Sequence, residues 1–227
     1  MANLQLIPNG FKQTGDICLL ASYSYILGYY KKLAEGVGAD VPTYDVCEAY
    51  YEYNMELLKN DNICQTYIDS IQIGHGCLMG INNQPKDNNT YECFISRILH
   101  FYCQKIKNDR LRGYDHIKEF DYYLLQKGNQ IRPVNYKIEK CLTGNNHIQN
   151  AFQEIERHLC ISEHNLAMLI FLSPCGGHSV VVAKDTNNDV ILFRDPNYSV
   201  VTKNASIFNT EFSNQLVITE YMLFSQV

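Results

Sequence analysis

Residues 166–195 read LAMLIFLSPCGGHSVVVAKDTNNDVILFRD, and this stretch is the strongest indication of the fold. Leu166–Leu172 is a continuous apolar run, and two further apolar runs follow at Ser179–Ala183 and Val190–Phe193. Apolar runs of this length, bounded by turn-forming residues, predict buried β-strands. Because the polar hexamer 184–189 joins the last two runs, they predict an antiparallel β-hairpin.

Further strand signals are confined to the second half of the chain. Leu216–Phe224 predicts one more strand, and Ile131–Ile138 predicts a weaker one. Pro133 lies inside the weaker run and has no backbone N–H to donate to a neighbouring strand. That strand is therefore expected at an edge of the sheet.

Helix signals dominate before residue 130. Over residues 17–32 apolar side chains recur at three- and four-residue spacing, which predicts a helix, and Asp16 is a candidate N-cap. Gly128 is expected at the position that ends a helix closing near Lys127, and residues 79–89 are expected to form a loop. The other expected helices span about 43–58, 90–106, 115–127 and 146–160.

Together these patterns predict one α+β domain over residues 1–227. Its helical half, about 1–130, is expected to pack against an antiparallel sheet formed by the β-rich half, about 131–227. The chain has 227 residues, and 46% of them are hydrophobic. That is enough to bury a substantial core.

The composition argues against several classes of protein. A net charge of −5 is unlike that of a nucleic-acid-binding protein, which usually has a basic face. The first residues show no export signal, and no stretch approaches the roughly 18 apolar residues of a membrane-spanning helix. The nine cysteines show no paired spacing. We therefore expect free thiols, a cytoplasmic location as synthesised, and neither a metal site nor a cofactor.

Cys18 is the first candidate for chemistry. Its thiol lies in the first turn of a predicted helix, where the helix dipole and unpaired backbone N–H groups favour the nucleophilic thiolate. Gly15 allows the chain to turn sharply just before it. The Gln13 side-chain amide could join the Cys18 backbone N–H in stabilising an oxyanion. The alternative is an inert cysteine in the core, a common use of this residue.

His178 and Asp195 are the second and third candidates. His178 directly follows Gly176 and Gly177, which leave room for a substrate backbone to approach. Asp195 ends the next predicted strand, seventeen residues later, and the hairpin should return it beside His178. We expect its carboxylate to hold the Nδ1–H of the imidazole. The alternatives are a structural histidine and an ordinary Asp-Pro-Asn turn.

These three residues, distant in sequence, fit one catalytic arrangement. A cysteine nucleophile needs a base beside it and a third group that orients the base. A cysteine at a helix start, with histidine and aspartate on adjacent strands far downstream, satisfies that requirement. The sequence therefore predicts thiol-dependent acyl transfer by Cys18, His178 and Asp195.

Three motifs resemble those of the papain-like cysteine peptidase superfamily. They are Gln13-x4-Cys18 at a helix start, GGHSVVV at 176–182 and FRDPN at 193–197. The most similar branches are the bacteriocin leader-cleaving peptidases and the Yersinia-type effector proteases, whose last motif also contains Asp-Pro-Asn. The resemblance covers about 35 residues in two blocks.

This resemblance implies a papain-like fold and a role for each matching residue. Cys18 would be the nucleophile, His178 the general base, Asp195 its orienting group and Gln13 an oxyanion donor. The substrate would be a protein or peptide. The resemblance also implies a bacterial effector that could reach a host cell by a secretion route without a signal peptide.

Three functions stay open at the level of sequence. The first is hydrolysis of a peptide or isopeptide bond through an acyl-enzyme. The second keeps the same three residues but changes the acceptor, as in a transglutaminase, a deamidase or an acyltransferase. The third is a papain-like binding module in which the thiol is idle.

Overall fold

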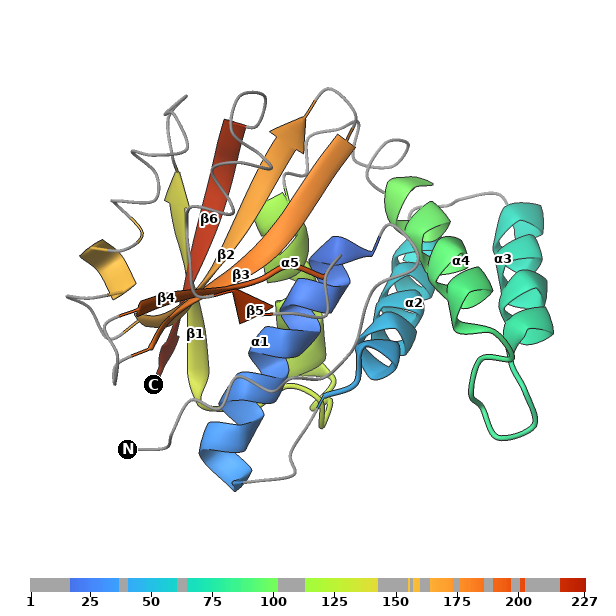
Figure 1. Ribbon diagram of the computed structural model, residues 1–227. Helices are drawn as coiled ribbons and strands as arrows, with labels where there is room; N and C mark the ends of the chain where they lie inside the picture. The colour runs from blue at the N-terminus through green and yellow to red at the C-terminus, as the bar shows by residue number, and fades with distance from the viewer. Residues whose placement is uncertain are drawn as a thin grey trace.

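The first helix, α1, spans Cys18–Glu35 and forms the centre of the molecule (Figure 1). Leu20, Tyr23, Ile26 and Leu27 on this helix are fully buried, as the three- and four-residue spacing predicts. The N-cap is Ile17, one residue later than the predicted Asp16. The computed structural model describes residues 17–36, 41–60, 65–101, 113–142, 155, 157–159, 164–173, 176–185, 190–196, 201–202 and 217–227.

Four further labelled helices follow α1 among the described residues. Helices α2, α3, α4 and α5 span Thr43–Asn60, Gln65–Leu78, Asn88–Phe101 and Gly113–Gln126. The predictions for α2, α4 and α5 are confirmed within a few residues, as is the loop between α3 and α4. Residues 102–106 of the predicted 90–106 helix lie outside the described residues, as does most of the predicted 146–160 helix.

Helix α5 ends as the sequence predicts. Gly128 has a φ of +59°, the left-handed conformation that glycine adopts without steric cost. Its N–H donates to the Leu125 carbonyl at 3.1 Å, and the Asn129 N–H donates to the Leu124 carbonyl at 3.0 Å. This pair of bonds is the Schellman arrangement, and it satisfies two carbonyls that the helix leaves open.

The strands form one antiparallel sheet in the order β1-β6-β2-β3-β4-β5. In chain order from β1 to β6, the strands span Tyr136–Leu142, His164–Ser173, Gly176–Asp185, Val190–Arg194, Val201–Thr202 and Val217–Gln226. The predicted β3–β4 hairpin is confirmed. The weak strand is at the sheet edge, as expected, but it begins at Tyr136, so Pro133 precedes it.

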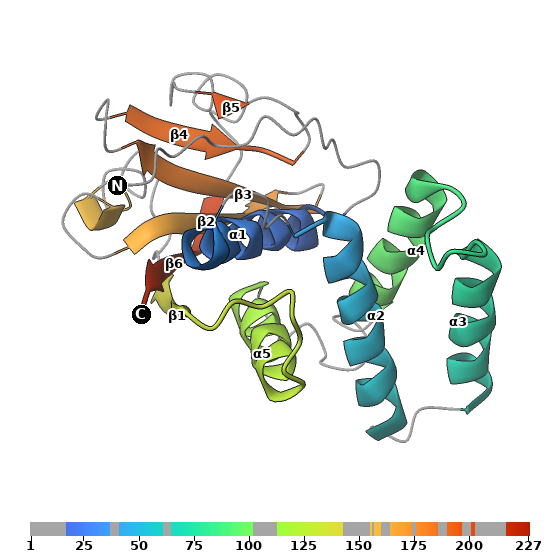
Figure 2. The ribbon, with the colours of Figure 1, turned by 90° about the horizontal axis from the view of Figure 1, so that it is seen from below.

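The helices lie in two groups, which Figure 2 separates. Helices α1 and α5 pack on the sheet, α1 mainly against β3 and α5 against β6. Helices α2, α4 and α3 extend outward from α1 in that order, away from the strands. The described part of the chain is therefore α+β, with helices from the first half packed on a sheet from the second. Among its helices, none is both long and apolar enough to cross a lipid bilayer.

A buried polar network ties α1 to α5 and to the start of β1. The Tyr23 hydroxyl donates to Asp121 Oδ1 at 2.5 Å and lies 2.8 Å from the Tyr136 hydroxyl, which also donates to Asp121. Arg132 Nε donates to the same carboxylate at 2.9 Å. Burial, followed by neighbouring negative charge, raises the pKa of Tyr23 and Tyr136 well above the usual value, so both stay neutral donors.

Candidate active site

Cys18 is the first residue of α1 and is partly exposed. Its sulfur is not in a disulfide and lies at the end of the helix where backbone N–H groups lack an intrahelical acceptor. The partial positive charge of those groups favours an anion at this position. Gln13 and Gly15, which the sequence analysis places beside Cys18, lie outside the described residues.

His178 is the third residue of β3 and pairs with Phe171 on β2. Its side chain is 15% exposed, so a substrate could still reach part of the ring. Gly176 and Gly177 are the first two residues of this strand and pair with β2, so the strand begins three residues before the predicted run at Ser179. The hairpin is longer than its apolar run indicates because backbone pairing continues into the glycines.

Asp195 follows directly after β4 and is buried beside His178. The last pair of the β3–β4 ladder joins Val181 to Arg194, so one further pair would set Asp195 opposite Val180. Val180 is two residues from His178, and side chains two apart on a strand share a face of the sheet. The register is therefore consistent with a carboxylate seventeen residues downstream meeting the imidazole.

The contact between them is a hydrogen bond of 2.9 Å from His178 Nε2 to Asp195 Oδ1. The predicted pair of residues is present, but the predicted atom is wrong, because the sequence analysis expected the carboxylate at Nδ1. The choice of nitrogen depends on the rotation of the ring, about which the sequence contains no information. With Nε2 held by Asp195, Nδ1 is the nitrogen left for another partner.

Cys18 is a second partner of the ring, and the two contacts change the charge of the ring. Burial alone lowers the pKa of His178, but hydrogen bonds to Asp195 and to the Cys18 side chain, with their negative charge, outweigh it. Together they raise the pKa of His178 to about 9. At neutral pH the ring is thus an imidazolium that contacts the Cys18 sulfur and a carboxylate. Such a group can give a proton to a leaving amine.

Two contacts that the sequence analysis missed join α1 to this hairpin. The Ser22 hydroxyl donates to the Ser179 backbone carbonyl at 3.1 Å. The Arg194 guanidinium lies over the Tyr25 ring, 4.6 Å from its centroid. In the sequence, Ser22 and Tyr25 differ from other residues only in their helical spacing from Cys18. Ser179 and Arg194 differ only in being next to His178 and Asp195. Many residues share such features, so the sequence does not identify these contacts.

A second histidine–carboxylate pair lies among the outer helices. His75 Nε2 is 2.8 Å from Glu48 Oε1, and Tyr91 donates its hydroxyl to the same oxygen. The His75 ring stacks on Tyr51 with centroids 3.9 Å apart. These contacts link α2, α3 and α4. They also explain why α3 is a helix although its own sequence buries only Ile68 and Ile71 and predicts no element.

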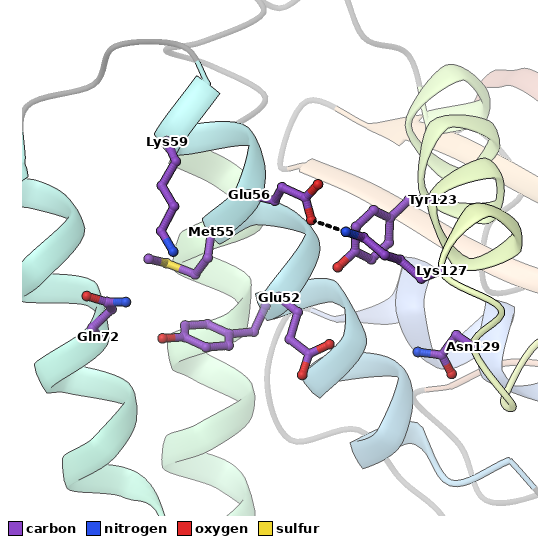
Figure 3. A pocket seen from close by; sticks show the side chains of 9 residues that line it. Glu52, Met55, Glu56, Lys59, Gln72, Tyr123, Lys127 and Asn129 are labelled. Atoms are coloured by element: carbon purple, nitrogen blue, oxygen red, sulfur yellow. Dashed lines mark ion pairs between the residues drawn. The ribbon is translucent and has the colours of Figure 1, made fainter.

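The pocket in Figure 3 lies between α2, α3 and α5 and has a volume of about 580 Å³. An ion pair of 2.8 Å between Glu56 and Lys127 crosses part of it. The described residues that line it are Tyr51, Glu52, Met55, Glu56, Lys59, Gln72, Tyr123, Lys127 and Asn129. None of them is Cys18, His178 or Asp195, so this pocket is separate from the candidate site.

Comparison of the chain with models of known protein families finds no match. Comparison with curated proteins finds no match either.

Proposed function

We propose that the chain is a papain-like cysteine peptidase that hydrolyses a peptide or isopeptide bond in a protein or peptide substrate. The observation that supports this most directly is one set of contacts. The His178 ring bonds to Asp195 through Nε2 at 2.9 Å and is hydrogen-bonded to Cys18 at the start of α1. Nucleophile, proton carrier and orienting group thus occur together in the order that acyl transfer requires.

The first half of the reaction would form an acyl-enzyme. The Cys18 sulfur, having given its proton to His178, attacks the substrate carbonyl carbon and forms a C–S bond. The carbonyl electrons move to oxygen, and the Cys18 backbone N–H and the Gln13 amide would stabilise that oxyanion. As the C–N bond breaks, the His178 imidazolium transfers its proton to the leaving amine.

The second half would release the acyl group to water. Neutral His178 removes a proton from water, and the hydroxide attacks the thioester carbonyl. The C–S bond breaks, the carboxylic acid departs, and the sulfur and ring return to their starting states. Asp195 keeps the ring in one orientation through both halves by holding Nε2.

The protonated state of His178 favours this assignment. A pKa of about 9 means that the ring enters the first half of the reaction already able to act as an acid. An amine is a poor leaving group unless it is protonated as it departs. The same ring must lose that proton before it can activate water, and the amine takes the proton away at the right step.

Thiol labelling tests the proposal without knowledge of the substrate. The intact protein is treated with iodoacetamide at pH 7, and each cysteine is followed by peptide mass spectrometry. Cys18 should react faster than the exposed thiols Cys77 and Cys93, and His178→Ala should remove the difference. Equal labelling of Cys18, Cys77 and Cys93 in the native protein contradicts the proposal.

A peptide library then separates hydrolysis from related chemistry. Cleavage that depends on Cys18, seen as two product masses, supports a peptidase. A change in side-chain mass without cleavage would instead assign transfer or deamidation, with the same three residues. A protein that labels rapidly at Cys18 yet changes no peptide, and still binds one as Cys18→Ser, would be a binding module.

A further inference from the structure

Two contacts between α1 and the β3–β4 hairpin are each adjacent in sequence to residues of the candidate site. Ser22 lies four residues after Cys18, and its hydroxyl donates to the carbonyl of Ser179, the residue after His178. Ser22 and Ser179 are both 1% exposed, so water does not compete for this bond. Helix α1 is thus hydrogen-bonded to β3, the strand that contains His178, one helical turn after Cys18.

The second contact is made three residues further along the same helix. Tyr25 presents its ring to the guanidinium of Arg194, which lies 4.6 Å from the ring centroid. Arg194 immediately precedes Asp195. Burial lowers the pKa of Arg194 only from its high usual value, so it remains a cation and the contact is a cation–π interaction.

Cys18, Ser22 and Tyr25 occupy positions i, i+4 and i+7 of α1, which lie on one face of a helix. We infer that Ser22 and Tyr25 are positioning residues that hold α1 in register with the hairpin, so that Cys18 meets the His178–Asp195 pair. This inference rests on the proposed function. Neither side chain would touch the substrate or the reacting atoms.

The geometry explains why two such contacts are needed. The apolar core under α1 is non-directional, so it resists separation of helix and sheet more strongly than it resists a small slide or rotation. The Ser22 bond to β3 sets the position along the helix axis, since a hydrogen bond weakens steeply with distance and angle. The Tyr25 contact to β4 opposes rotation about that bond. A misplacement of about 1 Å can cost a reaction roughly 100-fold.

Ser22→Ala is the first test, and Ser24→Ala is its matched control. Ser24 is also buried on α1, but its hydroxyl donates to the Ala21 carbonyl at 2.8 Å and contacts Thr43 of α2 at 3.0 Å. Both changes remove one buried, hydrogen-bonded hydroxyl from the same helix. Only Ser22→Ala breaks a bond to the hairpin, so a general loss of helix stability would affect the two variants equally.

Three measurements are made on each variant: iodoacetamide labelling of Cys18 at pH 7, titration of His178 by NMR, and unfolding in urea. We expect Ser22→Ala to slow labelling about tenfold, the factor that one hydrogen bond represents. The pKa of His178 should fall below about 9, because the ring loses the Cys18 bond. Ser24→Ala should keep both values, and Ser22→Thr, which retains the hydroxyl, should largely restore them.

Tyr25 gives an independent pair of variants. Tyr25→Phe retains the aromatic ring that faces Arg194 and should label Cys18 at the wild-type rate. Tyr25→Leu removes the ring and should slow labelling about fivefold, the factor expected for one cation–π contact. Tyr29→Leu is the control, because Tyr29 lies one turn further along α1 and its ring packs on Tyr30, 5.1 Å away. If Ser22→Ala does not fold, the Tyr25 pair decides the question.

The outcomes separate this inference from the function on which it rests. If His178→Ala slows labelling but Ser22→Ala and Tyr25→Leu do not, the positioning roles are wrong and the proposed function stands. Equal effects of Ser22→Ala and Ser24→Ala, with an unchanged His178 pKa, also overturn the inference. If His178→Ala itself leaves labelling unchanged, the proposed function is wrong.

Discussion

Two histidine–carboxylate pairs among the described residues have nearly equal lengths but very different surroundings. His178 bonds to Asp195 at 2.9 Å in the hairpin, and His75 contacts Glu48 at 2.8 Å among the outer helices. The first ring also contacts Cys18, whereas the second is stacked on Tyr51. A histidine–carboxylate pair alone does not make a reactive site. The other group that contacts the imidazole ring, a thiol or an aromatic ring, decides whether the histidine can take part in chemistry.

The cysteines beside these two histidine–carboxylate pairs show the same contrast. Cys18 is partly exposed at a helix N-terminus beside an imidazolium. Cys47, which precedes Glu48, is fully buried. Burial, followed by the charges of Glu92 and Glu48, raises the pKa of Cys47 far above the usual value, so it stays a neutral thiol. The outer helices have a histidine, a carboxylate and a cysteine, but not in a reactive arrangement.

The largest expected effect tests this contrast directly. His178→Ala should slow iodoacetamide labelling of Cys18 at pH 7 by about 100-fold or more, the usual contribution of a positioned acid–base group. His75→Ala, the matched change in the other pair, should leave the Cys18 rate unchanged. A similar loss in both variants would mean that the two pairs are not functionally different.

The next effect is a dependence of stability on pH. The folded-state pKa of His178, about 9, exceeds its ordinary value of 6.5, so the protonated ring stabilises the folded state. That contribution is fully present below about pH 6.5 and is lost as pH rises through about 9, in total up to ~3 kcal/mol.

Urea unfolding between pH 6 and 10 measures this contribution of protonated His178 to the free energy of unfolding. The decrease in the free energy of unfolding over this range should be smaller in His178→Ala by that amount. His75→Ala should keep the wild-type decrease. If the pH dependence is the same in all three proteins, the pKa of His178 is not raised.

A smaller effect is expected from the carboxylates. Asp195→Asn removes the charge that helps to raise the pKa of His178, so the ring should deprotonate at lower pH. If that pKa falls to about 7, the protonated fraction at pH 8, and with it any activity that needs the acid, falls about tenfold. NMR titration of His178 measures the shift. Glu48→Gln should not change that titration.

The smallest effect concerns the stability of the outer helices. Glu48→Gln weakens one acceptor shared by His75 and Tyr91, so we expect the free energy of unfolding to fall by ~1–2 kcal/mol. Labelling of Cys18 should stay at the wild-type rate. If Glu48→Gln slows labelling of Cys18, the outer pair is coupled to the candidate site.

Sequence patterns predicted the elements with strong periodicity or strong punctuation. The hairpin from His178 to Asp195 followed from two apolar runs and a polar turn, and the end of α5 followed from Gly128. The pattern for α3 was too weak, since only two of its side chains are buried and Gly74 and Gly76 are poor helix formers. That helix is stabilised by contacts with α2 and α4, which no local pattern reveals.

For the candidate site, the sequence by itself determined which residues could take part and that a hairpin would return Asp195 beside His178. Side-chain alternation and chain reversal are local properties, so they can be read from residue order. Only the tertiary structure decided that Nε2 rather than Nδ1 faces the carboxylate, that Cys18 reaches the same ring, and that Ser22 and Arg194 join helix to hairpin. Those contacts depend on how α1 lies against β3, and that placement brings together segments far apart in the sequence, which local periodicity does not specify.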